Sequence, residues 1–338
     1  MLPALLFAAA LSLLALPAAP VLAPSSPPSA AAAGRLVYLT CDYPACDAVV
    51  LSSLDLASGA TAPLWTLPAD TLDDAYTGNL LLADASTLLL GLQYDAAPAQ
   101  GALVTFDLAA RAPRATLNVS SCVVLLLDPA DAAGARLLCL AIVQGGPAAE
   151  VTQLRHIDRV TGADELVATL FPEHATFGEA ALSRGILYVP MAPLDGGAFF
   201  IAAVDPQSGR VLATNATFPF TLTMVGLVAD APAPGDGTAL SVVRTEDENG
   251  GDVRGFLARV DLATAAVTRI GAGLNMTRWT QLNPINALDA AAGILYLTAF
   301  EGGAGNALHL LGLDTGSGEL VYDRVVTNPF ADIVFVGA

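Results

Sequence analysis

An aspartate followed by a short turn-forming segment recurs six times along this chain at nearly constant spacing. These aspartates end apolar runs at Asp55, Asp107, Asp158, Asp205, Asp261 and Asp314, and neighbouring members are 47 to 56 residues apart. Small residues and glycine after an apolar run are typical of a tight turn between two strands. A period near fifty, with β-type sequence on both sides of each turn, predicts an architecture of repeated β-sheet units.

The last repeat shows most clearly how many strands each unit contains. Its apolar, β-branched runs predict four strands at residues 281–288, 294–299, 307–313 and 319–326, separated by two tight turns and a glycine-rich loop. The first of these turns recurs in the earlier repeats at Asp84, Asp128, Ser183 and Asp230, with Asp289 as the last member. Two turn series that run in step indicate a four-stranded antiparallel unit.

The two ends of the chain are complementary. The first repeat begins with its second strand, at residues 35–40, and therefore lacks an innermost strand. The carboxyl end carries one strand too many, at residues 332–336. Pairing these two segments would close a ring and remove two open sheet edges. We therefore expect an all-β, six-bladed β-propeller with four antiparallel strands per blade, closed by the C-terminal strand joining blade 1.

Four of the turns have the pattern Asp-x-x-Ser/Thr-Gly, beginning at Asp55, Asp158, Asp205 and Asp314. They resemble the blade turns of the broad quinoprotein-like and YVTN-like class of propellers, and the resemblance covers residues 35–338. The motif marks a blade hairpin and does not identify an activity. Only Trp65 and Trp279 are present, so no tryptophan recurs in every blade, and a redox enzyme holding a quinone cofactor is the lowest-ranked of three function hypotheses.

The first residues look like a targeting segment. An apolar run at residues 5–16 ends at Pro17 and is followed by alanine-rich sequence, which predicts a signal peptide over residues 1–23. A disordered Pro/Ser/Ala linker is expected at 24–34, before the propeller domain at 35–338. An uncleaved anchor is the alternative, but Pro3 and Pro17 leave less than the roughly 20 apolar residues of a membrane span. No membrane span is expected beyond this leader.

Cysteines and glycosylation sequons also favour a secreted or extracellular surface location. The four cysteines fit an oxidising compartment. We expect disulfide bonds Cys41–Cys46, across one loop, and Cys122–Cys139, between neighbouring antiparallel strands; a zinc site is the alternative for these thiols. Sequons begin at Asn118, Asn215 and Asn275.

Charge restricts the partners and the chemistry. The chain has 32 acidic and 14 basic residues, a net charge of −18, and every basic residue is arginine. An acidic surface repels phosphate backbones, so no nucleic-acid partner is expected. The absence of lysine excludes a Schiff-base mechanism.

The loops between second and third strands and the connections between blades share one face of such a ring, which we take as the candidate ligand face. Polar residues at the starts of innermost strands would line the central channel. These candidates are Asn79, Glu179, Asn283 and Asp332. They resemble the channel residues of calcium-dependent lactonases and phosphotriesterases, which implies a calcium-dependent hydrolase. The alternative is a structural role at strand ends.

Other candidates for chemistry are weaker. A solvated hairpin tip or a calcium site would explain the acidic segment that contains Glu246, Asp247, Glu248 and Asp252. No Gly-x-Ser-x-Gly elbow is present. His156 and His309 fall on third strands, as packing residues, and His174 falls in an interblade loop, where it is a weak candidate for a catalytic base.

The sequence therefore favours a secreted or cell-surface binding module without an identifiable catalytic motif, acting on an unknown small ligand or protein. A calcium-dependent, lactonase- or esterase-like hydrolase with carboxylates in the central channel is the alternative. We identify no catalytic residue and predict no cofactor; calcium belongs to the alternative alone.

Overall fold

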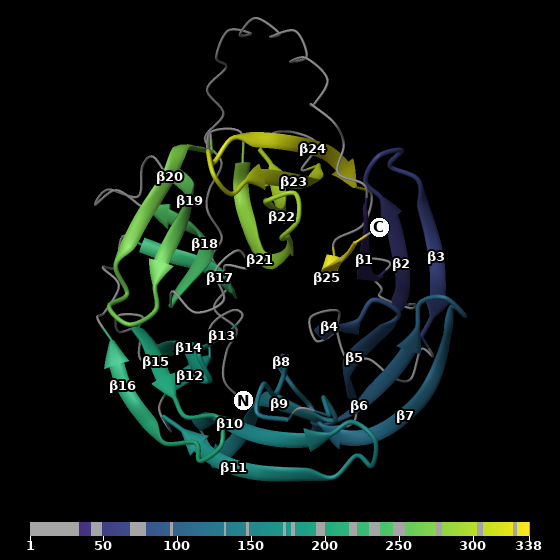
Figure 1. Ribbon diagram of the computed structural model, residues 1–338, viewed down its shortest axis with the longest axis vertical. Helices are drawn as coiled ribbons and strands as arrows, with labels where there is room; N and C mark the ends of the chain where they lie inside the picture. Colours follow the sequence, from purple (N-terminus) through teal and green to yellow (C-terminus); the bar gives the residue numbers. More distant parts are fainter. Residues whose placement is uncertain are drawn as a thin grey trace, which may run out of the picture.

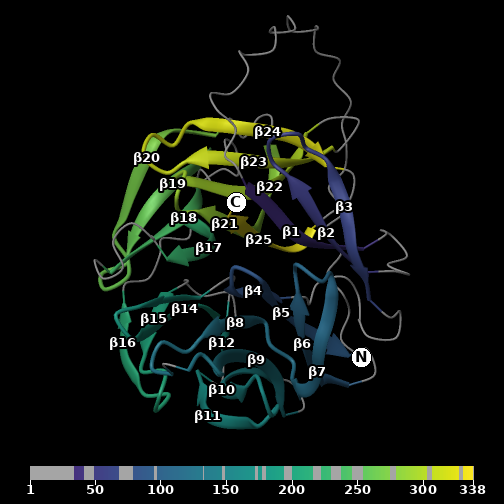
Figure 2. The same ribbon diagram turned by 45° about the vertical axis from the view of Figure 1, so that its right-hand side comes forward.

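The computed structural model is a ring of six antiparallel sheets around a central axis (Figures 1 and 2). The residues that the structure describes are 34–41, 49–67, 79–94, 97–131, 133–146, 149–171, 174–176, 180–193, 200–215, 222–229, 237–245, 254–274, 279–302, 307–326 and 330–337. All regular elements in these ranges are strands. Within the same ranges, no helix has the length and apolar character needed to cross a membrane.

Blades 1 to 3 each contain four strands, named below in order from the innermost to the outermost. Blade 1 consists of β25 (Phe330–Gly337), β1 (Gly34–Cys41), β2 (Val49–Asp55) and β3 (Thr61–Thr66). Blade 2 consists of β4 (Asn79–Asp84), β5 (Thr87–Tyr94), β6 (Ala97–Asp107) and β7 (Ala112–Ser120). Blade 3 consists of β8 (Val124–Leu127), β9 (Arg136–Gly146), β10 (Ala149–Asp158) and β11 (Asp164–Leu170).

Blades 4 to 6 follow the same order, except that the innermost strand of blade 4 is split into two pieces. Blade 4 consists of β12 (His174–Thr176) and β13 (Ala181–Ser183), both paired with β14 (Ile186–Pro193), then β15 (Phe200–Val204) and β16 (Val211–Asn215). Blade 5 consists of β17 (Leu222–Ala229), β18 (Thr238–Thr245), β19 (Arg254–Asp261) and β20 (Val267–Leu274). Blade 6 consists of β21 (Trp279–Asp289), β22 (Ile294–Glu301), β23 (Leu308–Asp314) and β24 (Leu320–Val326).

The predicted ring closure is confirmed. β25 pairs antiparallel with β1, with Arg35 opposite Val336 and Tyr38 opposite Ile333, and the register shifts at a bulge after Leu39. The C-terminal strand β25 consequently lies beside β1 as the innermost strand of blade 1 (Figure 1). Ile333 and Val336 are buried in this seam. The strand that blade 1 lacks at its amino end is supplied by the carboxyl end.

Sheet faces pack against the faces of neighbouring blades, and apolar residues alternate along the strands to fill these interfaces. Between blades 6 and 1, for example, Leu36 and Leu54 meet Tyr296 and Leu310 in one buried cluster. Because both faces of most strands meet a neighbouring blade, inner strands such as β5 are apolar on consecutive residues, as at Leu88, Leu89 and Leu90.

The recurrent aspartate ends the third strand of every blade and closes a turn of five residues. In the first, the Gly59 amide donates to the Asp55 carbonyl at 2.7 Å, and the Ser58 amide donates to Asp55 Oδ1 at 2.7 Å. The fifth residue of the turn has positive φ in all six blades. It is glycine four times, at Gly59, Gly162, Gly209 and Gly318, but Arg111 (φ 54°) and Ala265 (φ 56°) occupy it in blades 2 and 5.

These turns also explain how one blade docks on the one before it. A methyl group added at Gly209 would lie 2.2 Å from Cβ of Ala168, on the outermost strand of blade 3. A methyl group at Gly318 would lie 2.3 Å from the carbonyl oxygen of Ile270, on the outermost strand of blade 5. Glycine is therefore required at these positions for two reasons: the positive φ of the backbone and the close approach of the neighbouring sheet.

A candidate pocket in blade 3

The face predicted to bind ligand falls largely outside the described residues. Cys46, Glu179, Glu246, Asp247, Glu248, Asp252 and Asn275 all lie there. Cys41, Asn215 and Asn283 belong to β1, β16 and β21, but their side chains are not described. Asn118 is exposed on β7. Of the predicted channel residues, only Asn79 and Asp332 are described with their side chains.

Both of these channel candidates link innermost strands of neighbouring blades. Asp332 on β25 accepts a hydrogen bond from the Leu80 amide on β4 through Oδ2, at 2.5 Å, and from its neighbour Ile333 through Oδ1, at 2.8 Å. Asn79 Nδ2 donates to the Cys122 carbonyl oxygen, just before β8, at 2.5 Å. The two side chains thus connect blades 1, 2 and 3 in series around the axis.

The carboxyl group of Asp332 is the most strongly perturbed acid in the described part of the chain. Burial raises its pKa to about 7, against the two backbone hydrogen bonds, which favour the charged form. A carboxyl group that titrates near neutral pH is typical of functional sites, although structural groups can show the same shift.

Next to this series, a disulfide bond joins Cys122 to Cys139, with the Cα atoms 5.4 Å apart. This is the pairing that the sequence predicts for these two residues. Cys139 lies on β9, and Cys122 lies two residues before β8 rather than within it. Both residues are buried in the cluster between blades 2 and 3.

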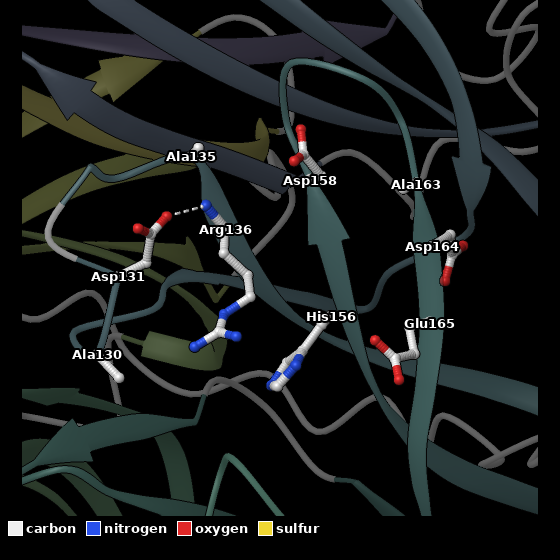
Figure 3. Close-up of a pocket in the computed structure, with 9 residues that line it drawn as sticks. All are labelled: Ala130, Asp131, Ala135, Arg136, His156, Asp158, Ala163, Asp164 and Glu165. Carbon is white, nitrogen blue, oxygen red and sulfur yellow. Dashed lines mark hydrogen bonds between the residues drawn. The ribbon is translucent and has the colours of Figure 1, made fainter.

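A cavity of about 590 Å³ opens at the opposite end of blade 3 from the predicted ligand face. It is bounded by the turn between β8 and β9 and the turn between β10 and β11 (Figure 3). Its lining residues are Ala130, Asp131, Ala135, Arg136, His156, Asp158, Ala163, Asp164 and Glu165. The volume lies within the range of small-molecule sites in proteins.

Strand register determines which of these side chains share one face. On β9 and β10, Arg136 is opposite Asp158, and on β10 and β11, His156 is opposite Glu165. Directly opposed residues project to the same side of a sheet. Asp164, one residue earlier, projects to the other side, where its Oδ2 accepts the Ser120 amide of blade 2 at 2.6 Å. Figure 3 shows Glu165 turned toward His156 and Asp164 turned away.

The turn after β15 in blade 4 holds the Arg136 side chain in place. Arg136 Nε donates to Asp128 Oδ2 at 2.5 Å, and its Nη2 donates to Gln207 Oε1 at 2.7 Å. Gln207 Nε2 in turn donates to both oxygens of Asp128 at 3.1 Å. Burial opposes the ionisation of Asp128, but its bonds from the Ala130 amide, Gln207 and Arg136 outweigh this and hold its pKa below the usual range.

His156 is 9% exposed and contributes its ring to the wall of this pocket. Its Nε2 lies 2.9 Å from the Pro206 carbonyl oxygen of blade 4. A carbonyl oxygen can only accept, so Nε2 carries the proton, and Nδ1 of the neutral ring carries a lone pair. No residue in the described part of the chain hydrogen-bonds this Nδ1.

The other two histidines have local partners. His309 lies on the third strand of blade 6, as expected, with Nδ1 2.6 Å from Asp323 Oδ1 and its ring edge-on to Trp279. The sequence predicts His174 in an interblade loop, but it begins β12, and its ring packs against Phe171 and Phe200. The short β12 is not predicted because its residues, His-Ala-Thr, carry no strand pattern of their own.

The sequence pattern makes His156 a packing residue and does not single out Arg136, Asp131 or Glu165. The sequence signal that could have indicated this pocket is the cross-strand pairing of Arg136 with Asp158 in one hairpin. The residues of blade 4 that contact this end of blade 3 could not be predicted in this way, because they reach it only when the next repeat docks. Within the described ranges, no three metal-ligating side chains of the His, Cys, Asp and Glu types come together.

Comparison with known proteins establishes the fold. No family model matches the chain, and no curated protein matches its sequence. Among solved structures, the periplasmic gluconolactonase PpgL of Pseudomonas aeruginosa superposes with a TM-score of 0.55 at 14% identity, over 90% of this chain and 99% of that one. A putative 6-phosphogluconolactonase of Bacteroides fragilis gives 0.53 at 10% identity, over 90% and 98%. The class that fold and closure define is the six-bladed β-propeller.

Proposed function

We propose that this protein is a secreted or cell-surface binding module, and that the pocket lined by blade 3 takes a ligand bearing an ammonium group. The observation that carries this proposal is the opposed pair His156–Glu165 beside a cavity of about 590 Å³. The exposed Glu165 makes no ion pair with another described residue, and His156 presents a lone pair at Nδ1. Both groups can accept a hydrogen bond from an ammonium group.

The rest of the pocket supports the same ligand charge. The carboxylate of Asp131 holds the turn by accepting the Arg136 amide at 2.6 Å, drawn as a dashed line in Figure 3, and Asp158 accepts the Val160 and Thr161 amides at 2.8 Å. Both remain negative because these bonds, with those of their own turns, lower their pKa values. Arg136, the one cation among the described lining residues, is already paired with Asp128. The remaining field in the pocket is therefore negative.

A secreted or surface location is part of this proposal. It rests on the leader at residues 1–23, the sequons at Asn118, Asn215 and Asn275, and the Cys122–Cys139 bond, which suits an oxidising compartment. Membership of the quinoprotein-like and YVTN-like class rests on the four Asp-x-x-Ser/Thr-Gly turns.

The test compares two probes of equal shape and different charge. Nα-acetyl-lysine amide and Nα-acetyl-norleucine amide are titrated into the intact protein by NMR at constant ionic strength. We expect saturable binding of the lysine compound alone, weakened at least fivefold by Glu165→Gln. Glu319→Gln, which removes an exposed charge in blade 6, is the matched control. Equal binding of the two probes, or equal effects of the two substitutions, would refute the proposal.

A calcium-dependent hydrolase remains the second candidate, and the raised pKa of Asp332 favours it. The lactonase names of two structural neighbours agree with this candidate, although they share only the fold with this chain. A melting temperature that rises in calcium relative to chelator, and that no longer rises in Asp332→Asn, would favour the hydrolase. No response to calcium would leave the binding module ahead.

A further inference from the structure

A second cavity, of about 350 Å³, lies between blades 6 and 1, next to the seam that closes the ring. Blade 1 contributes polar and apolar residues to its wall, and the last residues of β24 face them. The lining residues are Tyr38, Thr40, Val50, Ser52, Leu54, Gly59, Thr61, Ala62, Pro63, Arg324, Val325 and Val326. None of its described lining residues is a carboxylate, although acidic residues outnumber basic ones 32 to 14 in the whole chain.

Of the described lining residues only Arg324 is charged, and it is partly buried. Its guanidinium lies over Gly59, and its one hydrogen bond goes to the Ser58 carbonyl oxygen at a long 3.5 Å. No carboxylate of the described residues pairs with it. Asp323, the preceding residue, lies on the opposite face of β24, where it meets His309 at 2.6 Å. Among the described residues, the positive charge beside the cavity therefore has no counter-ion.

Three residues in the wall that carry hydroxyl groups are largely buried. Tyr38, Thr40 and Ser52 are 7%, 8% and 9% exposed, and Tyr38 is hydrogen-bonded to Ser52. The Thr40 hydroxyl has no hydrogen-bond partner among the described residues, while it lines the cavity. This hydroxyl lines the cavity without being fully enclosed, so water or a ligand can form a hydrogen bond with it.

We infer that this cavity is a second ligand site, which binds the carboxylate group of a small, otherwise apolar molecule. Arg324 supplies the charge, because a planar guanidinium pairs with both oxygens of a carboxylate. Thr40 supplies a hydroxyl donor. Val50, Leu54 and Pro63 supply the apolar wall for the rest of the ligand. The volume, near the lower limit for small-molecule sites, fits a compound of a few carbon atoms.

The experiment titrates the intact protein with butyrate and with butyramide, which has the same shape and no charge. Ionic strength is held constant with sodium chloride, and binding is followed by NMR. We expect saturable binding of butyrate, at least tenfold stronger than that of butyramide. Arg324→Gln should abolish this preference for the anion, whereas Arg210→Gln, an exposed arginine in blade 4, should leave it unchanged.

Thr40→Val gives a second, independent reading, because it removes the hydroxyl and preserves the shape of the side chain. We expect it to weaken butyrate severalfold and to leave butyramide unaffected. Equal binding of the two probes to the wild-type protein overturns the inference. So does a loss of butyrate binding that is the same in Arg324→Gln and Arg210→Gln, since that result would report general attraction to positive charge.

Discussion

The carboxylate of Asp332 accepts a hydrogen bond from the backbone amide of Leu80, which lies 252 positions earlier in the chain, at 2.5 Å. This bond joins the strand that closes the ring to the innermost strand of blade 2. Asn79, adjacent to Leu80, continues the link to Cys122 in blade 3. The chain end is thus held by a pair of strands in blade 1 and by a polar contact to the next blade.

Asp332 should make the stability of the protein fall as the pH rises from about 4 to about 7. The carboxyl group has a pKa of about 3.9 in the unfolded chain, whereas in the folded protein its pKa is about 7 and it keeps its proton up to that pH. The folded state binds more protons between these values, so the free energy of unfolding decreases with pH there. Urea denaturation across this range checks the slope, which Asp332→Asn should remove.

Asp84→Asn is the matched control for that experiment. Hydrogen bonds from Ser86 lower the pKa of Asp84 below its ordinary range, so its contribution to stability is lost only as the pH falls through that lowered pKa. The substitution should leave the slope between pH 4 and 7 as in the wild-type protein. A slope that survives in Asp332→Asn would show that another group causes it.

Arg111→Gly should stabilise the protein. Arg111 is exposed and has a φ of 54° at the turn position that is glycine in four other blades. The left-handed conformation costs a residue with Cβ about 1–2 kcal/mol, and the greater flexibility of unfolded glycine offsets part of this. We expect a gain of about 0.5–1 kcal/mol in urea denaturation. No gain, or a loss, would show that the Arg111 side chain makes a compensating contact.

Gly209→Ala should be strongly destabilising, by about 2 kcal/mol or more. The residue has a φ of 67°, and a methyl group there would overlap Cβ of Ala168 in the preceding blade. Gly185→Ala is the control, since its φ is 73° but nothing lies within 4 Å of an added methyl group. Because both substitutions share the backbone strain, the difference between their midpoints of unfolding measures the clash with the preceding blade alone. Equal losses of stability would show that the turn does not act as a docking element.

Replacing both Cys122 and Cys139 by alanine should cost about 3 kcal/mol in the chain-entropy description, because the bond closes a loop of 17 residues. Chemical denaturation with and without reductant checks this value. Reductant should lower the stability of the wild-type protein and leave the double variant unchanged. A wild-type stability that reductant does not alter after complete reduction would contradict the expectation.

Removing residues 330–338 should abolish the cooperative folding of the ring. The deletion exposes the edge of β1 and uncovers the apolar seam that Ile333 and Val336 fill. We expect aggregation or a loss of monomer in size-exclusion chromatography with light scattering. A monomer with the wild-type midpoint of unfolding would mean that the closure contributes little.

The arrangement of strands could be predicted from sequence because it depends on local chemistry that repeats. Asp314 and Gly318 close a turn in the same way as Asp55 and Gly59, since in each pair the glycine amide donates to the aspartate carbonyl oxygen. The strand predicted at 281–288 extends over Trp279–Asp289, and the C-terminal strand predicted at 332–336 extends over Phe330–Gly337. Period, strand order and the missing innermost strand together left only one way to close the ring.

The two pockets were decided by tertiary structure alone. Gln207 meets Asp128 across 79 positions, and Arg324 meets Ser58 across 266, because each blade docks on its neighbour through side chains that belong to different repeats. No local pattern encodes such a contact, since the turn motif is the same whether the next sheet brings an apolar residue, an arginine or a hydroxyl group. The sequence by itself determined a closed six-bladed ring, and only the packing of blades determined where it leaves room for a ligand.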